Sequence, residues 1–139
     1  MTLYLLLMML GISFFDFRSY TIPDLFQVFL LIGRLFISTS MKEICFSAAN
    51  GLCVALPLFL LRFLMNHLLH QECMGDGDLK LVFSLGIYFD LFHDLLALLF
   101  ACIFGLLLSL FYLRKQKRMI PFGPCICGGF LIILLWNGP

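Results

Sequence analysis

The hydrophobic residues of the chain are gathered into six long runs, and polar residues mark the breaks between these runs. Each run is apolar on every face, unlike a helix on the surface of a soluble protein, which carries a single apolar stripe. A helix that crosses a membrane needs about 20 apolar residues, so the third, fifth and sixth runs span easily while the other three are short. We predict one helix for each run: Thr2–Phe15, Leu25–Ser38, Ile44–Leu69, Leu79–Phe89, Leu91–Leu113 and Ile120–Trp136.

The composition of the chain agrees with a membrane protein. Hydrophobic residues make up 63% of it and charged residues 12%, whereas soluble domains average about 45–50% and about 25%. The charged residues lie in or beside the breaks, apart from Arg34 and Arg62, as they do in bundles of membrane helices. No long linker divides the chain. We therefore expect an all-α fold, a polytopic integral membrane bundle of about six transmembrane helices that forms a single domain over residues 1–139.

The distribution of basic residues predicts how the bundle is oriented. Six crossings place both termini on one side of the membrane, together with Lys42. The opposite side receives Arg18, Lys80 and the basic cluster between Arg114 and Arg118, and an excess of Lys and Arg marks the cytoplasmic side. We interpret the cluster as a topology anchor in contact with the lipid bilayer. A net charge of +1 leaves no broad basic surface for nucleic acid.

Two breaks on the predicted cytoplasmic side contain the most informative acidic residues, Asp16 and Asp78. A straight helix rises about 1.5 Å per residue, which places Asp78 roughly 18 Å from Asp90 and Asp16 roughly 22 Å from Met1. Because the hydrocarbon core is about 30 Å thick, both carboxylates should lie below the cytoplasmic interface at a similar depth. An ionised side chain is costly at such a position and is usually functional.

A pair of carboxylates in this setting predicts the acid–base chemistry of an aspartic protease. Two close carboxylates cannot both ionise easily, so one keeps its proton while the other acts as a general base toward water. Gly75 and Gly77 flank Asp76, and we expect these glycines to let the backbone adopt unusual angles and approach a bound chain closely. We interpret Asp76 itself as a residue that faces solvent.

Two alternatives to this interpretation stay open: a metal-dependent membrane hydrolase, and a non-catalytic membrane component that serves assembly or transport. Potential metal ligands crowd the second break, but their spacing matches no H-E-x-x-H pattern. These residues are His67, His70, Glu72, Cys73, Asp76 and Asp78. The chain's six cysteines form no CxxC pair, and we interpret them as packing residues. We predict no metal and no cofactor.

The two breaks also contain sequence motifs. The first, D-x-R-x-x-x-I-P, is formed by Asp16, Arg18, Ile22 and Pro23. The second, G-x-G-D-x-K-L, is formed by Gly75, Gly77, Asp78, Lys80 and Leu81. A third segment, from Pro121 to Pro124, lies near the start of the last apolar run. In these three motifs, in their order and in the helices that separate them, the chain resembles the type IV prepilin peptidase family.

The resemblance implies an intramembrane aspartic endopeptidase with Asp16 and Asp78 as its catalytic pair. It implies that the substrates are prepilins or pilin-like secretion subunits (pseudopilins). These are cut at the cytoplasmic face of the bacterial inner membrane, after a glycine that ends a short basic leader. The supporting site residues that the resemblance implies are Arg18, Pro23, Gly75, Gly77 and Lys80.

Larger bacterial members of this family carry two further features. One is an extra N-terminal helix, and the other is a cytoplasmic domain with paired CxxC motifs, which accompanies methylation of the new pilin N-terminus. Neither feature is found in this sequence. We therefore expect a short form of the enzyme, without the methyltransferase domain, that cleaves its substrate and does not methylate it.

Overall fold

The computed structural model describes residues 1–19, 22–38, 40–69, 75–114 and 122–136. Every regular element within these ranges is a helix, which confirms the all-α prediction, and each of the six predicted helices is found. The helices are α1 (Thr2–Ser19), α2 (Asp24–Ile37), α3 (Met41–Leu69), α4 (Asp76–Gly86), α5 (Leu91–Arg114) and α6 (Gly123–Trp136).

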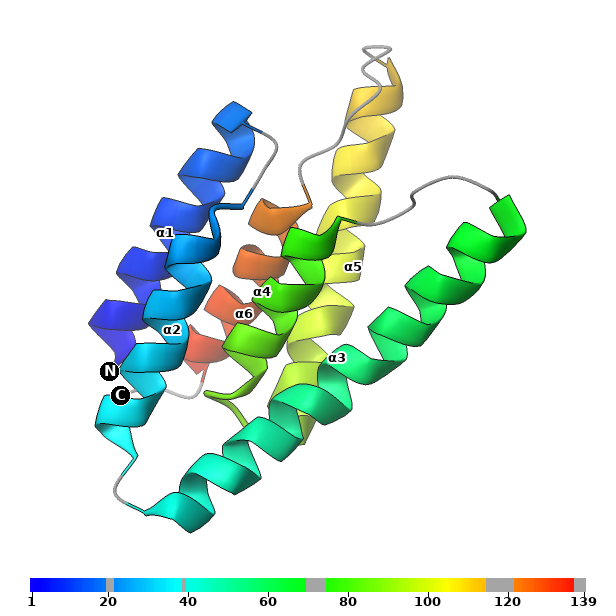
Figure 1. Ribbon diagram of the computed structural model, residues 1–139. Coiled ribbons are helices and arrows are strands. Elements are labelled where there is room, and N and C mark those ends of the chain that lie inside the picture. Colours follow the sequence, from blue (N-terminus) through cyan, green and yellow to red (C-terminus); the bar gives the residue numbers. More distant parts are fainter. Residues whose placement is uncertain (20–21, 39, 70–74, 115–121, 137–139) are drawn as a thin grey trace.

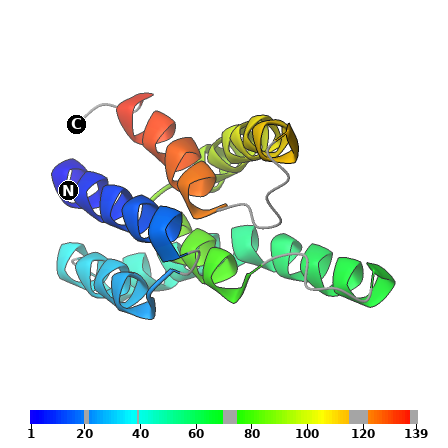
Figure 2. The ribbon, with the colours of Figure 1, turned by 90° about the horizontal axis from the view of Figure 1, so that it is seen from above.

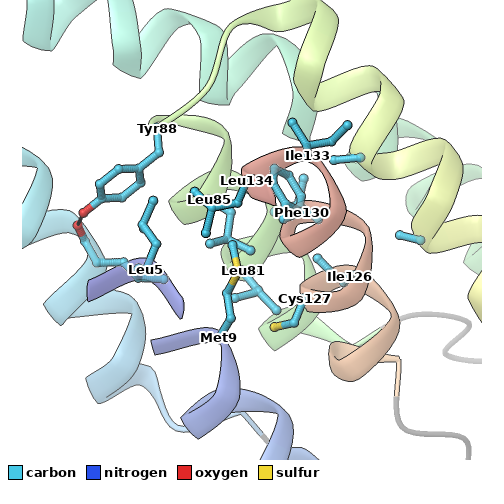
Figure 3. Close-up of a cluster of buried hydrophobic side chains, with 14 of the residues drawn as sticks. Leu5, Met9, Leu81, Leu85, Tyr88, Ile126, Cys127, Phe130, Ile133 and Leu134 are labelled. Atoms are coloured by element: carbon cyan, nitrogen blue, oxygen red, sulfur yellow. Dashed lines mark hydrogen bonds between the residues drawn. The ribbon is translucent and has the colours of Figure 1, made fainter. Parts of the chain in front are cut away.

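The core lies where α1, α4 and α6 meet (Figures 1 and 2). The short helix α4 packs against α2, α3 and α6, while α6 packs against α1 and α5. Figure 3 shows the apolar side chains that fill this region, among them Leu5, Met9, Leu81, Leu85, Ile126 and Phe130, all of which are buried. Because α4 is held from three sides, the residues at its start have a fixed position in the bundle.

Among the described residues, three helices are long and apolar enough to cross a membrane, over Thr2–Ser19, Met41–Leu68 and Leu91–Phe111. Their outer faces carry large apolar side chains that are exposed, such as Leu7, Phe59 and Leu106. Exposed apolar side chains suit a surface that contacts lipid, whereas the backbone polar groups are satisfied within each helix.

Two of the lengths that we inferred differ from those of the structure. The first helix, which we judged short, continues past Phe15 to Ser19 and reaches spanning length. The last helix, which we expected to span easily, has only 14 described residues, from Gly123 to Trp136. Pro124 lies in its first turn, where proline is favoured because the N–H group that it lacks would have no partner there. The predicted start at Ile120 lies outside the described residues.

The arrangement of helix ends agrees with the predicted topology. The end of α1 and the starts of α4 and α6 lie at one end of the bundle, and the start of α1, the end of α2 and the start of α3 lie at the other (Figure 1). The assignment of the first of these ends to the cytoplasm stays a prediction, based on the excess of basic residues there.

Single cysteines at Ser19 and Ser40, introduced into a variant without the native cysteines, should report this topology. The two residues lie at opposite ends of the bundle. We expect Ser40→Cys to react with a membrane-impermeant maleimide added to intact cells, and Ser19→Cys to react only after the membrane is opened, because basic residues mark the cytoplasmic end. Labelling of both cysteines from the same side would contradict the arrangement.

Candidate active site

Asp16 lies in the last turn of α1, where its carboxyl group is buried against the start of α6. Only 4% of the residue is exposed. The backbone N–H of Gly123 donates a hydrogen bond of 3.0 Å to Oδ2 of Asp16. Gly123 is the first residue of α6, and N–H groups in the first turn of a helix have no partner within that helix. The positive end of the α6 dipole therefore faces this carboxylate.

Asp78 lies in the first turn of α4 and is partly buried. A hydrogen bond from the backbone of Gly75 and the charge of Asp16 both act on its carboxyl group. The carboxyl groups of Asp16 and Asp78 are thus close enough to interact, although they come from helices far apart in the sequence. The structure brings the two residues of the expected catalytic pair together.

Both carboxylates lie in helices, so our placement of them in breaks between helices is wrong. Helix α1 continues through Asp16, and α4 begins at Asp76, ahead of the predicted start at Leu79. Acidic residues in the first turn of a helix stabilise it through the helix dipole, which explains the early start of α4. The expected unusual backbone is not found either. Gly75 has a φ of −70° and a ψ of 148°, which any residue can adopt, and Gly77 is helical.

The role of Gly77 is instead set by close packing. A Cβ atom at this position would lie 3.3 Å from Cβ of Ile22. Ile22 is the isoleucine of the first motif. Gln27 of α2 is 5% exposed, and its Nε2 donates a hydrogen bond of 3.2 Å to the carbonyl oxygen of Gly77. Helix α2 therefore holds the turn that carries Asp78. Sequence reasoning missed Gln27, because one glutamine within an apolar run carries no motif.

Two ion pairs lie near the start of α4. The Nζ atom of Lys80 lies 2.9 Å from Oδ1 of Asp24, and Arg62 of α3 pairs with Asp76. The hydrogen bond from Arg62 holds the pKa of Asp76 below its usual value. The side chain of Asp76 is 76% exposed, so it faces solvent, as we predicted. The environment of Asp76 differs from that of the buried Asp16.

The other two charged or rigid motif residues, Arg18 and Pro23, flank the connection from α1 to α2. Arg18 is exposed in the last turn of α1. A basic residue at the end of a helix interacts favourably with the helix dipole. Pro23 directly precedes α2 with a φ of −63°, so its ring fixes the backbone where the helix starts. Both positions fit a structural role in this connection.

Cys125 of α6 lies near the two carboxylates, and its burial agrees with the packing role that we predicted. It is buried, and its thiol lies close enough to Asp16 and Asp78 for both charges to act on it. Its place directly after the segment from Pro121 to Pro124 is the one signal in the sequence that could have revealed this.

The alternative of a metal site depends on residues that are only partly described. Among the described residues, no three His, Cys, Asp or Glu side chains are grouped so that they could hold a metal ion. His70, Glu72 and Cys73 lie outside the described residues, so the expected absence of a metal stays a prediction.

The profile of one known protein family matches most of the chain. The sequence profile of the type IV leader peptidase family matches residues 3–110. The chain belongs to this family. The matched part includes both Asp16 and Asp78, so the two interacting carboxylates lie within the segment that defines membership.

Relatives of this leader peptidase family member carry the name prepilin leader peptidase/N-methyltransferase. The protein from Legionella pneumophila is 29% identical over 138 residues, covering 93% of this chain and 47% of the relative. The protein from Aeromonas salmonicida (strain A449) is 30% identical, over 93% of this chain and 46% of the relative. The protein from Pectobacterium carotovorum subsp. carotovorum is 28% identical, over 98% of this chain and 51% of the relative. The chain thus spans about half the length of these curated relatives. No solved structure matches it.

Proposed function

We propose that this member of the type IV leader peptidase family is an intramembrane aspartic endopeptidase that removes the leader peptide of prepilins or pseudopilins. The interaction between the carboxyl groups of Asp16 and Asp78, at one end of the helix bundle, carries the proposal. The names of the relatives support the class of substrate. The basic residues at the same end support cleavage on the cytoplasmic side of the bacterial inner membrane.

In the mechanism that we propose, the two carboxyl groups share one proton. We assign the general base to Asp16, whose charged form the hydrogen bond from Gly123 favours, and the proton to Asp78, on which the charge of Asp16 acts. Asp16 takes a proton from water while the water oxygen bonds to the scissile carbonyl carbon, and Asp78 donates its proton to the carbonyl oxygen. Asp16 then protonates the amide nitrogen as the C–N bond breaks, and Asp78 recovers a proton from the intermediate's hydroxyl group.

The name of the relatives gives two activities, a leader peptidase and an N-methyltransferase. The peptidase activity is the one that we propose for this chain. The chain aligns with about half of each relative, and both interacting carboxylates lie within that half. We therefore expect these 139 residues to contain the groups that cleave a prepilin.

The purified protein in phospholipid vesicles should cut a peptide that consists of a basic leader, a glycine and an apolar segment, directly after the glycine. Cleavage should survive a metal chelator, because two carboxylates activate the water without a metal ion. Mass spectrometry of the products, with and without chelator, is the measurement. Loss of cleavage on chelation that zinc restores would favour the metal-dependent hydrolase, and failure to cleave under either condition would favour the non-catalytic component.

A further inference from the structure

A groove with a volume of about 590 Å³ runs between α2, α3 and α4. Its walls are single faces of α2 and α3, since the residues that line each wall recur at intervals of three and four positions. Val28 lines the groove from α2, and Leu52 and Leu56 line it from α3. The floor is a face of α4 that includes Leu79 and Phe83. The groove is therefore built from regular helix surfaces.

The interior of this groove is apolar and open to its surroundings. Val28, Leu52 and Leu56 are 51%, 54% and 46% exposed. Ser84, a polar residue in the lining, already donates a hydrogen bond of 2.8 Å to the carbonyl oxygen of Lys80. A ligand that matches this interior must offer apolar surface, because the walls offer little to a polar group.

One end of the groove lies beside the helical turn that carries Asp78. Leu79 and Lys80 of its floor directly follow Asp78 along α4. Gln27, a residue of the α2 wall, is bonded to the carbonyl oxygen of Gly77. Both views of the fold show α3 leaning away from α2 toward the end of the bundle where α4 begins (Figures 1 and 2). A chain that lies in the groove therefore leads to the start of α4, beside the two carboxylates.

Charged residues stand at this same end. The side chains of Asp24 and Asp76 are 70% and 76% exposed. Each forms an ion pair, with Lys80 and Arg62 respectively, and ion pairs with an exposed partner contribute little to stability. A basic segment that reaches the end of the groove would meet two carboxylates able to exchange partners.

We propose that this groove binds the apolar segment of the substrate that follows the scissile bond, in the form of a helix. The inference rests on the proposed peptidase function. An apolar segment in hydrocarbon must satisfy its backbone hydrogen bonds internally and so enters as a helix. Helices associate in membranes through close van der Waals packing, which an open groove between two helices provides. The basic leader then lies beyond Asp78, next to Asp24 and Asp76.

Photocrosslinking in the full chain tests this binding directly. A benzophenone amino acid is placed at Leu56 in the groove or at Ile103 on α5, positions that are each 46% exposed. The protein is mixed with the leader–glycine–apolar peptide in phosphatidylethanolamine and phosphatidylglycerol vesicles. We expect the peptide to crosslink from position 56 at roughly five times the yield from position 103, because only the first position packs against it.

Because crosslinking does not need cleavage, the groove and the peptidase function can fail separately. The same experiment in an Asp78→Asn background should give the same yield from position 56. Crosslinking from position 56 without cleavage by the parent protein would contradict the proposed peptidase function and support binding of the peptide in the groove. Cleavage together with equal crosslinking yields from positions 56 and 103 would support the peptidase function and contradict binding of the peptide in the groove. Cleavage with crosslinked adducts only to lipid or to a second copy of the chain would lead to the same conclusion.

Filling the groove gives a second test. Leu56→Trp should raise KM for the full peptide by roughly fivefold with kcat almost unchanged, since it removes packing contacts made equally in the ground and transition states. A peptide truncated shortly after the glycine should be cut by this variant as it is by the parent, and Ile103→Trp should affect neither peptide. Equal effects of Leu56→Trp on the long and short peptides would overturn the proposal.

Discussion

Asp16→Asn and Asp78→Asn should each lower the rate of prepilin cleavage by roughly a hundred- to ten-thousand-fold, because each removes one member of an acid–base pair. Asparagine has nearly the size of aspartate and keeps a carbonyl oxygen that can accept the hydrogen bond donated to Asp16 by Gly123. Membrane insertion and the temperature of unfolding in detergent should therefore change little. Single-turnover cleavage of the leader–glycine–apolar peptide by the purified variants measures the effect.

Asp76→Asn is the matched control for these variants, because it makes the same chemical change two residues from Asp78. Asp76 is exposed and pairs with Arg62, and a surface ion pair contributes little to stability. We expect this variant to keep most of the parent kcat, and any effect of losing one of the two carboxylates beside the basic leader should appear in KM. An inactive Asp76→Asn together with an active Asp78→Asn would move the catalytic role within the first turn of α4 and contradict our assignment.

The helices were predictable because each coincides with a run of apolar residues, but their ends were not. Polar residues in the last turn of α1 and the first turn of α4 suggested breaks, whereas both turns are helical. A helix end tolerates such residues when the dipole favours their charge, as with Arg18 at the end of α1 and Asp76 at the start of α4. Apolar runs alone therefore placed Asp16 and Asp78 outside the helices that position them.

The two carboxylates of the candidate site could be proposed from two motifs, but the contacts that support them could not. The residues that touch the carboxylates come from distant parts of the chain, as Gly123 and Asp16 are 107 positions apart. Gln27 holds Gly77 through a single side-chain bond, and Cys125 lies in an apolar helix. No spacing rule links positions on different helices, since their contacts depend on how the helices pack.

Gly123→Ala should lower kcat by roughly ten- to a hundredfold, because a small displacement of a catalytic group has a large effect on rate. A Cβ atom at this position would lie 2.7 Å from Oδ2 and 3.0 Å from Cγ of Asp16. These separations are too short for non-bonded atoms, so the carboxyl group must move away from the start of α6. The measurement is kcat and KM for the leader–glycine–apolar peptide, and we expect KM to change little because the groove is untouched.

Gly128→Ala, in the same helix, separates this local effect from a general effect of alanine in α6. A Cβ atom at Gly128 would lie 3.4 Å from Cδ2 of Phe104, a contact that a small shift of the ring relieves, and alanine favours a helix over glycine by about 1 kcal/mol. Gly128→Ala should keep its activity and unfold at the parent temperature or slightly above it. If Gly123→Ala cleaved as fast as Gly128→Ala, the position of the Asp16 carboxyl group against α6 would not matter for catalysis, and our use of the hydrogen bond from Gly123 to assign the general base would be wrong.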